Sequence, residues 1–280
     1  MTGAGIVTYQ PDLKKLKSNI ESIYKQVDRV VIIDNGSKNI NDIYNLQSTF
    51  SNVEIRPLKK NEGVAAALNH ILDWANKLEM KWVLTLDQDS QCLPGVINDY
   101  EKLSHIPNVA MISSRRKDVN FGFEKADLFE QEYIEVERCI TSCCYTNVNA
   151  ALKVGGFDES MFIDYVDFDM CYSLKEHGYK IIKSHFIGFM HELGESQKKY
   201  FFKREVVVTN HSPLRRYYYG RNIIYFIRKH KKSINKFRYY VRAYGRLAVV
   251  LVYEVNKKEK LKEGIRGMID GYKMPLNKEE

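Results

Sequence analysis

Two aspartates separated by one glutamine follow a hydrophobic run, and this spacing can bring two carboxylates onto one cation. The run covers residues 81–86, and Asp87, Gln88 and Asp89 come directly after it. Mg²⁺ and Mn²⁺ prefer oxygen ligands and often complete their coordination shell with phosphate oxygens. A single Asp-x-Asp motif occurs often by chance, so its place at the end of a hydrophobic run is what predicts a metal and phosphate site.

Two earlier hydrophobic runs also end in polar residues. Thr8 and Tyr9 end the first run of the chain, and Asp34 and Asn35 end the second. If these runs are parallel strands, their carboxyl ends meet at one edge of the sheet, where such sheets bind ligands. An aspartate there can accept a hydrogen bond from the imide N–H of uracil or thymine, although Asp-Asn-Gly-Ser is equally a turn sequence.

Four acids gather in the second half of the chain. Asp158, Asp164, Asp167 and Asp169 fall within twelve residues. Clustered carboxylates raise one another's pKa, which suits a general base. Acids also stabilise the first turn of a helix, an explanation that fits Asp164 best, whereas catalysis is preferred for Asp167. His191 follows another hydrophobic run and offers an imidazole as a third metal ligand, although a single histidine is more often structural.

The spacing of hydrophobic residues predicts the elements that carry these groups. In the first 90 residues it predicts, in order, strand 5–9, helix 13–24, strand 30–33, strand 53–56, helix 63–74 and strand 81–86. This alternation is typical of an α/β domain with a mainly parallel sheet. Further on, the pattern predicts strands at 109–112, 133–136 and 180–182, a helix ended by Gly178, helical structure from 213 to about 253, and a loosely held polar tail from 257.

Composition narrows the class of protein. With 280 residues, 44% of them hydrophobic and 28% charged, the chain resembles an ordinary globular protein. No hydrophobic run approaches the roughly 18 residues that a membrane-spanning helix needs. The five cysteines form no paired spacing, so we expect buried thiols in a reducing cytoplasm and no disulfide framework or zinc site. The start of the chain has no leader pattern for export.

Charge is concentrated near the C-terminus. Residues 198–262 contain 19 Lys and Arg against 3 Asp and Glu, a balance of +16. The whole chain carries +8, so the rest of the chain carries −8. Seven tyrosines lie among the eleven basic residues of the segment 215–246. Basic and aromatic residues on helices suit an anionic membrane surface, and they also suit nucleic acid or a solvated face.

Taken in order, these pieces resemble glycosyltransferase family 2, the inverting GT-A transferases. The matching pieces are residues 6–11, 32–37, 61–69, 87–90, 155–159, 165–169, 191–196 and 212–222. The resemblance implies a GT-A fold, the Rossmann-like fold of nucleotide-diphosphosugar transferases, with a mixed, mainly parallel central sheet. The implied catalytic domain covers 1–211, with a nucleotide-binding half of about 1–92 and an acceptor half of about 93–211. Residues 212–280 form a basic helical extension.

Within that family the chain is most similar to bacterial rhamnosyltransferases of O-antigen, capsule or cell-wall synthesis. The similarity lies in Asp-Gln-Asp-Ser at 87–90, Phe-Ile-Asp-Tyr-Val-Asp at 162–167, the Arg-Arg-Tyr-Tyr run, and the ending 264–271. The implied donor is dTDP-β-L-rhamnose. A transferase that uses a UDP-hexose is the alternative, because thymine and uracil offer the same imide contact. A nucleic-acid-binding protein would leave Asp87, Asp89, Asp167 and His191 unexplained, and the presence of Asp89 and Asp167 argues against an inactive scaffold.

The resemblance assigns roles to individual residues. Asp167 is implied as the base that deprotonates the acceptor hydroxyl, even though Val166 replaces the glutamate that usually precedes this base. Asp89 and His191 are implied ligands of a divalent cation, Mg²⁺ or Mn²⁺, and Asp34 is the implied reader of the pyrimidine imide. The implied nucleotide- and substrate-binding residues are Thr8, Tyr9, Asp34, Asn35, Lys60, Asn61, Gly63, Asp87, Gln88, Arg215, Arg216 and Arg221.

The implied partners follow from this assignment. We expect a nucleotide-sugar donor, a saccharide or lipid-linked saccharide acceptor, and peripheral binding of the basic helices to the inner face of the cell membrane. Nucleic acid is not expected as a partner, and association into a homo-oligomer is left open. The expected location is the cytoplasm, at that membrane surface.

Overall fold

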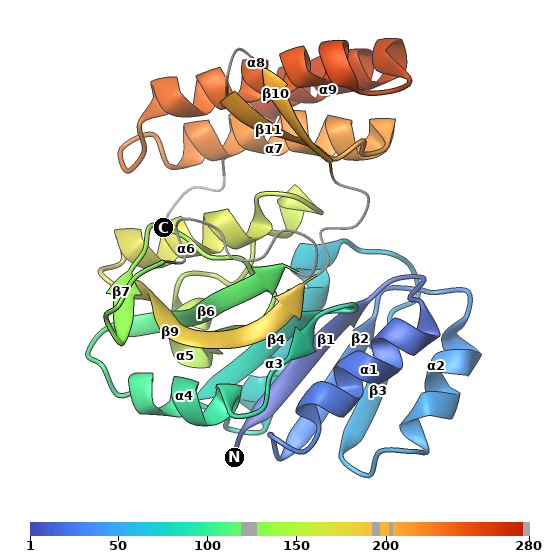
Figure 1. Ribbon diagram of the computed structural model, residues 1–280, viewed down its shortest axis with the longest axis vertical. Coiled ribbons are helices and arrows are strands. Elements are labelled where there is room, and N and C mark those ends of the chain that lie inside the picture. The colour runs from blue at the N-terminus through green and yellow to red at the C-terminus, as the bar shows by residue number, and fades with distance from the viewer. Residues whose placement is uncertain (119–127, 192–196, 202–203, 277–280) are drawn as a thin grey trace. The chain divides into compact units, whose positions relative to one another are not determined.

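The computed structural model describes residues 1–118, 128–191, 197–201 and 204–276 (Figure 1). The chain divides into two compact units. The N-terminal unit comprises Met1–Ser160 and Val166–Glu192, and the C-terminal unit comprises Met161–Tyr165 and Leu193–Glu280. This division falls before the expected boundary at 211/212, because the hairpin of β10 (Gln197–Phe201) and β11 (Arg204–Val208) packs against the C-terminal helix α8 (Lys236–Tyr253).

A mixed sheet forms the centre of the N-terminal unit. The described strands follow the order β3-β2-β1-β4-β8-β6-β9-β5, and β7 pairs with β9. Their bounds are β1 Gly3–Thr8, β2 Arg29–Asp34, β3 Val53–Pro57, β4 Trp82–Asp87, β5 Gln91–Cys92, β6 Val109–Asp118, β7 Tyr133–Glu135, β8 Cys144–Asn147 and β9 Lys180–His191. Strands β1 to β4 are parallel, β8 is antiparallel to β4 and β6, and β6 is parallel to β9. The predicted α/β class with a mainly parallel sheet is confirmed.

Helices cover both faces of this sheet (Figure 1). On one face, α1 (Leu13–Ile23), α2 (Ile40–Gln47) and α4 (Val96–Leu103) bury their apolar sides in one core with the sheet. On the other face, α3 (Val64–Lys77) packs against β1, β2 and β4, next to α5 (Val148–Lys153). Gly5 of β1 lets α3 lie close to the sheet, because a Cβ atom at Gly5 would lie 2.4 Å from the side chain of Ile71 on α3. Ala4 and Ile6, on either side of Gly5, belong to the core on the other face, as the two-residue period of a strand requires.

The sequence pattern predicted the end of one of these helices correctly and missed another helix. Helix α6 (Val166–Glu176) ends before Gly178, which has a φ of +81°, so the predicted stop is confirmed. Helix α2 was missed, because the pattern led from strand β2 directly to strand β3. In α2 only Ile43 is buried, and eight residues with one buried position give too little periodicity to distinguish a helix from a loop.

The C-terminal unit contains three long helices, α7 (Pro213–Lys229), α8 and α9 (Lys257–Lys273). The predicted helical stretch to residue 253 is interrupted at 230–235. The tail from 257, expected to be loosely held, is the helix α9 and packs along α7. Glycine allows α9 to lie against the backbone of α7, because a Cβ atom on Gly267 of α9 would lie 2.1 Å from the carbonyl oxygen of Tyr217 on α7. A hydrophobic pattern cannot show a helix interface that depends on backbone contact.

Two expectations from composition can be compared with the described residues. All five cysteines are buried and free, as expected for thiols that serve as small apolar side chains. No described helix has both the length and the hydropathy to cross a membrane.

Candidate active site

The carboxyl ends of β1, β2 and β4 bring three of the predicted site residues together. In the parallel register Thr8 lies opposite Asp34, and Val7 lies opposite Asp87. These strands end at one edge of the sheet, where α/β proteins of this kind bind ligands. The local hydrophobic runs therefore placed their polar ends at a common edge, as predicted.

Asp34 lies beneath the surface of this edge. Its side chain is 0% exposed. The hydroxyl of Thr8 donates to Oδ1 at 2.9 Å, and the backbone N–H of Ser37 donates to Oδ2 at 2.8 Å. Both carboxylate oxygens thus accept hydrogen bonds from the chain, and the implied contact of Asp34 with the pyrimidine imide stays a prediction. The carboxylate holds Thr8 and Ser37 in place, because a buried carboxylate requires hydrogen-bond donors.

Asn35 joins the edge to the loop that opens α3. Its amide nitrogen donates to the carbonyl oxygen of Gly63 at 2.9 Å, and its amide oxygen accepts from the N–H of Glu62 at 2.8 Å. The side chain of Asn61 accepts from the N–H of Gly63 at 3.0 Å. Gly63 has a φ of +94°, which a residue with a side chain rarely adopts. Lys60 and Asn61 are thus held beside Asn35, and Lys60 is exposed.

The Asp-Gln-Asp segment completes this part of the edge. The backbone N–H of Tyr9 donates to the side-chain oxygen of Gln88 at 2.9 Å, which connects the segment to the end of β1. Asp87 and Gln88 are half-buried, whereas Asp89 is exposed. The segment therefore presents one carboxylate to solvent and keeps the other close to the strand ends.

Asn19 is a contributor that the sequence reasoning missed. It lies on α1, is 0% exposed, and donates from its amide nitrogen to the carbonyl oxygen of Asp87 at 2.5 Å. It stands three residues after the buried Leu16 and one before the buried Ile20. A polar residue on the apolar face of a helix was the available signal, because a buried amide needs partners.

Strand pairing brings the two implied metal ligands towards each other. Strand β5 is antiparallel to β9, and Gln91 lies opposite Met190. Asp89 comes two residues before Gln91 at the start of β5, and His191 comes directly after Met190 at the end of β9. Because the two strands are antiparallel, the start of one and the end of the other lie at the same edge of the sheet. The side chain of His191 lies outside the described residues. Among the side chains that are described, no three His, Cys, Asp or Glu residues are grouped to hold a metal ion.

The donor set fits a divalent cation of the first transition row. One carboxylate and one imidazole supply an oxygen and a nitrogen, a combination that Mn²⁺ accepts and that Mg²⁺ favours less. Two protein ligands leave the remaining positions to phosphate oxygens and water. The residues present therefore suit a cation that is bound together with a diphosphate.

Asp167 is more exposed to solvent than Asp158 and Asp169 of the same acidic cluster. It lies in the first turn of α6 and is half-buried, and its Oδ1 accepts from the N–H of Phe168 at 2.9 Å. By contrast, Asp169 is 1% exposed, and Asp158 is 9% exposed and accepts from the hydroxyl of Ser160. Asp167 is thus a carboxylate of this cluster that is open to solvent and fixed to a helix.

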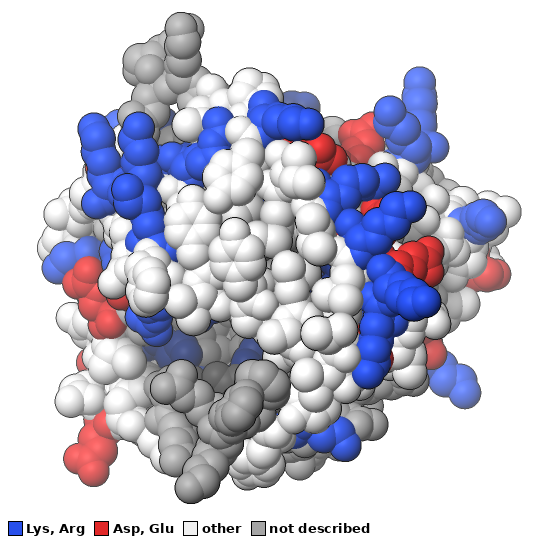
Figure 2. All heavy atoms as spheres, turned by 90° about the horizontal axis from the view of Figure 1, so that it is seen from above, with Lys and Arg blue, Asp and Glu red and all other residues white. Residues whose placement is uncertain are grey.

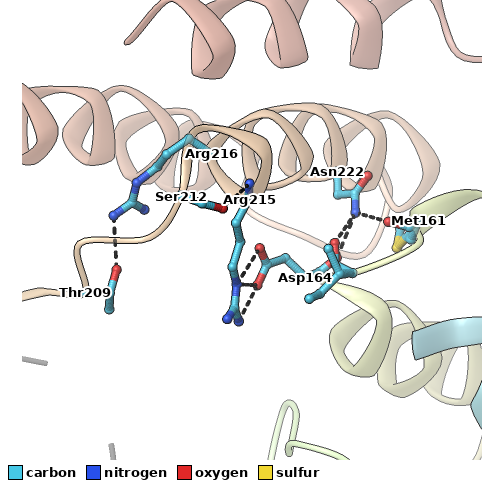
Figure 3. A network of polar contacts seen from close by, with 8 residues as sticks. Met161, Asp164, Thr209, Ser212, Arg215, Arg216 and Asn222 are labelled. Atoms are coloured by element: carbon cyan, nitrogen blue, oxygen red, sulfur yellow. Dashed lines mark hydrogen bonds and ion pairs between the residues drawn. The ribbon is translucent and has the colours of Figure 1, made fainter. Parts of the chain in front are cut away.

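Arg216 has a structural role in the C-terminal unit. Its side chain is 3% exposed and forms an ion pair with the buried Glu254. It also donates to the hydroxyl of Thr209 at 3.0 Å (Figure 3). Lys260 is also bonded to Glu254, at 3.2 Å. A buried guanidinium needs such partners, so these contacts give Arg216 a structural role, and its implied contact with the nucleotide stays a prediction.

Arg215 and Arg221 remain partly exposed. Arg215 forms an ion pair with Asp164, with 3.2 Å between Nη2 and Oδ1 (Figure 3). The guanidinium of Arg221 lies over the ring of Tyr218, 4.7 Å from its centroid, and donates from Nε to Asn222 at 3.0 Å. Both arginines are fixed on α7, and Arg215 retains 42% of its side-chain surface exposed.

An apolar surface flanked by basic residues covers α8 and α9. We define the α8–α9 surface by side chains that are 48–77% exposed, namely Phe237, Val241, Tyr244, Leu251, Ile265, Ile269 and Tyr272. A hydrogen bond with Tyr240 raises the pKa of Tyr272 to about 12, so the two helices adjoin there. Figure 2 shows this broad uncharged area between groups of Lys and Arg side chains.

This fold and its site define a class of protein. A mixed, mainly parallel sheet with acids at its carboxyl edge and a helical C-terminal part is the GT-A architecture of nucleotide-diphosphosugar transferases. The sequence model of the family described as Glycosyl transferase family 2 matches residues 4–159. The match covers more than half of the chain, and the protein therefore belongs to this family and is a glycosyltransferase.

Individual relatives agree with that class. The chain is 26% identical over 286 residues to the dTDP-rhamnosyl transferase RfbF of Shigella flexneri, an alignment that covers 96% of this chain and 94% of RfbF. Residues 1–349 of S. aureus TarS in complex with UDP-GlcNAc superpose with a TM-score of 0.65 at 14% identity, covering 96% of this chain and 81% of that one. GalNAc-T7 with UDP, GalNAc and Mn²⁺ superposes with a TM-score of 0.61 at 12% identity, covering 98% and 56%.

Proposed function

We propose that the protein transfers L-rhamnose from dTDP-β-L-rhamnose to a saccharide acceptor, with inversion at the anomeric carbon. The observation that carries this proposal is the similarity to the dTDP-rhamnosyl transferase RfbF over 96% of the chain. That similarity extends through both the sheet and the basic helices. The family by itself leaves the donor open, so the donor rests on this relative.

The donor occupies the carboxyl edge of β1, β2 and β4. Thr8, Tyr9 and Asn35 line the base and ribose, and the buried Asp34 acts on them through its hydrogen bond with Thr8. Lys60 supplies an exposed positive charge for the diphosphate. A nucleotide diphosphate gains from charge-assisted hydrogen bonds in such a position. Further donor contacts are assigned to Asn61, Gly63, Asp87, Gln88, Arg215 and Arg221.

Asp89 and His191 are the residues that would hold a divalent cation, Mg²⁺ or Mn²⁺. When bound, the cation supplies Lewis-acid neutralisation of the charge that develops on the leaving diphosphate. The exposed side chain of Lys60 adds positive charge for the leaving diphosphate. The chain thus contributes one exposed carboxylate, one imidazole and one cationic side chain to the departure of dTDP.

Asp167 acts on the acceptor. Its carboxylate accepts the proton of the acceptor hydroxyl while the hydroxyl oxygen forms a bond to the anomeric carbon. The bond from that carbon to the diphosphate oxygen breaks on the opposite face, and dTDP leaves with the electron pair. The product is an α-L-rhamnoside, and the proton remains on Asp167 until solvent removes it.

The acceptor is a lipid-linked saccharide at an anionic membrane surface. The α8–α9 surface carries large apolar side chains next to Lys and Arg, and α8 contains no Asp or Glu. Apolar side chains that enter the headgroup region, with cations beside anionic lipids, are the features of helices that lie on a membrane. We assign the α8–α9 surface to that contact.

A donor panel tests the function. Purified protein is mixed with dTDP-rhamnose, UDP-glucose, UDP-galactose or UDP-GlcNAc, with and without Mn²⁺ or Mg²⁺, and thermal stabilisation and donor hydrolysis are measured. We expect selective, metal-dependent stabilisation by dTDP-rhamnose, and loss of the metal-dependent part in Asp89→Asn. Preference for a UDP-sugar would overturn the rhamnose assignment, and no response to any nucleotide would overturn the proposed activity.

A further inference from the structure

The segment that leads into α6 has a backbone that side chains rarely adopt. Phe162, Asp164 and Tyr165 have φ angles of +59°, +65° and +68°. Residues other than glycine stay in this left-handed region only where surrounding contacts hold them there. Tyr165 is followed directly by Val166, the first residue of α6, and then by Asp167. The path of this segment therefore determines where the helix that carries Asp167 begins.

Asn222 of α7 is the side chain that holds this backbone (Figure 3). It is 0% exposed. Its amide nitrogen donates to the carbonyl oxygens of Met161, Ile163 and Asp164 at 2.5, 2.7 and 2.9 Å. The carbonyl of Met161 also accepts from the backbone N–H of Ile163 at 2.7 Å, and the buried amide adds its hydrogen bonds to those that this irregular segment makes with its own backbone.

Neighbouring contacts fix Asn222 and support the same segment. The amide oxygen of Asn222 accepts from Nε of Arg221 at 3.0 Å, which directs the amide nitrogen towards the carbonyls. The ring of Phe162 stacks on the ring of Tyr218, with 4.8 Å between centroids. Both contacts come from α7, the helix that also carries Asn222.

We propose that Asn222 is a positioning residue for Asp167. The inference rests on the proposed function, because it requires Asp167 to be the base. Asn222 does not touch the substrate. It keeps the segment 161–165 in its left-handed conformation, so that α6 begins at Val166 and the carboxylate of Asp167 stays in line with the acceptor hydroxyl. A shift of about 1 Å in a reacting group can lower a rate about 100-fold.

A double-mutant cycle tests whether Asn222 acts through Asp167. We expect Asn222→Ala to lower kcat about 10- to 100-fold, with a change of less than about threefold in KM for the donor. In an Asp167→Asn background, the same substitution should change the residual rate less than about twofold, because the group that it positions is absent. An equal loss of rate in both backgrounds would overturn the inference.

Asn52 provides a matched control. Its amide nitrogen also donates to three backbone carbonyls, those of Tyr24, Val27 and Asp28, at 2.7, 3.2 and 3.4 Å. It lies just before β3, at the amino edge of the sheet. Asn52→Ala should lower thermal stability, as Asn222→Ala does, but leave kcat within about twofold. A similar loss of kcat in both variants would assign the effect to stability and overturn the inference.

Hydrogen exchange measures the segment without reference to turnover. In Asn222→Ala we expect faster amide exchange in residues 160–168. If that variant does not fold, Tyr218→Leu removes the ring beneath Phe162 and should give the same change. Unchanged exchange in the folded variant would overturn the inference. If Asp167 is not the base, Asp167→Asn will keep near-full turnover. The exchange measurement is independent of that result, because it tests only whether Asn222 holds the segment 161–165.

Discussion

Asp167 is partly exposed and is fixed in the first turn of α6, whereas Asp158 and Asp169 of the same acidic cluster are buried. A general base must lie within hydrogen-bond reach of the proton that it accepts, which requires a carboxylate that solvent and substrate can approach. The substitution Asp167→Asn keeps the shape of the side chain and removes its capacity to accept a proton. We expect kcat to fall about 10²- to 10⁴-fold. The donor affinity, measured by calorimetry, should remain close to that of the wild type.

Glu176 offers a control on the same helix. It is an exposed acid in the last turn of α6, away from the end that carries Asp167. Glu176→Gln should leave kcat within about twofold, because an exposed surface acid seldom affects a distant site. Turnover near the wild-type value in Asp167→Asn would contradict the base assignment, as would equal losses in the two variants.

His211 makes the stability of the protein dependent on pH. Burial, followed by the charges of Arg215, Arg216 and Arg246, lowers the pKa of His211 to about 3. The unfolded chain binds a proton on this histidine below about pH 6.5, whereas the folded chain does not. Stability from this group is therefore fully present above that pH and decreases as the pH falls towards 3.

We expect the wild type to lose about 1 to 2 kcal/mol of unfolding free energy through His211 between pH 7.5 and pH 5. Solvent reaches the half-buried side chain and screens the neighbouring charges, so the loss is smaller than the full pKa shift would give. Denaturant unfolding at both pH values measures the change. His211→Gln carries no titrating group and should lose less stability over the same range. Equal losses in the two proteins would contradict this prediction.

At the scale of elements, α7 is the helix on which the C-terminal unit is organised. It contacts the segment 161–165 through Asn222, and it packs against α9 through glycines. A Cβ atom on Gly267 would meet the carbonyl oxygen of Tyr217 at 2.1 Å, and one on Gly220 would meet that of Gly264 at 2.3 Å. Backbone atoms cannot move aside as flexible side chains do, so these positions require glycine.

Gly267→Ala should therefore lower the free energy of unfolding by about 1 to 3 kcal/mol, the usual cost of overpacking. Gly245 on α8 is a matched control, because a Cβ atom there meets nothing within 4 Å. Gly245→Ala should stabilise the protein by about 0.5 to 1 kcal/mol through helix propensity. Denaturant unfolding of both variants measures the difference. Equal effects would show that the α7–α9 contact does not depend on glycine.

At the scale of the whole molecule, charge and exposed apolar area lie in the same part of the chain. Residues 198–262 carry a balance of +16 while the rest of the chain carries −8, and the α8–α9 surface lies within or next to that segment. We expect the protein to co-sediment with vesicles that contain phosphatidylglycerol and not with vesicles of phosphatidylcholine alone. Each well-placed Lys or Arg gains about 1 kcal/mol on an anionic leaflet, so binding should weaken as salt is raised.

The apolar contribution can be separated from the charge. Phe237 and Val241 are 77% and 55% exposed on α8, and replacing both with serine should weaken vesicle binding at every salt concentration. Tyr44, 42% exposed on α2, is the control, and Tyr44→Ser should bind as the wild type does. Absence of binding to anionic vesicles at low salt would contradict the membrane assignment, as would burial of this surface in a dimer detected by light scattering.

The sequence anticipated the parts of the molecule that depend on local pattern. Hydrophobic runs identified β1, β2 and β4, and the residues after each run identified Thr8, Asp34 and Asp87 at a common edge. The order of the strands and helices was sufficient to predict a mainly parallel α/β sheet. Periodicity failed for α2, in which one residue is buried, and for α9, in which glycines make the contact.

The amino-acid sequence by itself determined which strands end at the common edge and predicted which residues there could carry chemistry, because strand period and turn residues are local properties of the chain. Only the tertiary structure decided how those residues are used. Asp34 is covered by Thr8 and Ser37, Arg216 is paired with Glu254, and the amide of Asn222 satisfies carbonyls about 60 residues earlier in the chain. Burial and pairing depend on neighbours that are distant in sequence, and a local pattern contains no information about which neighbours those are.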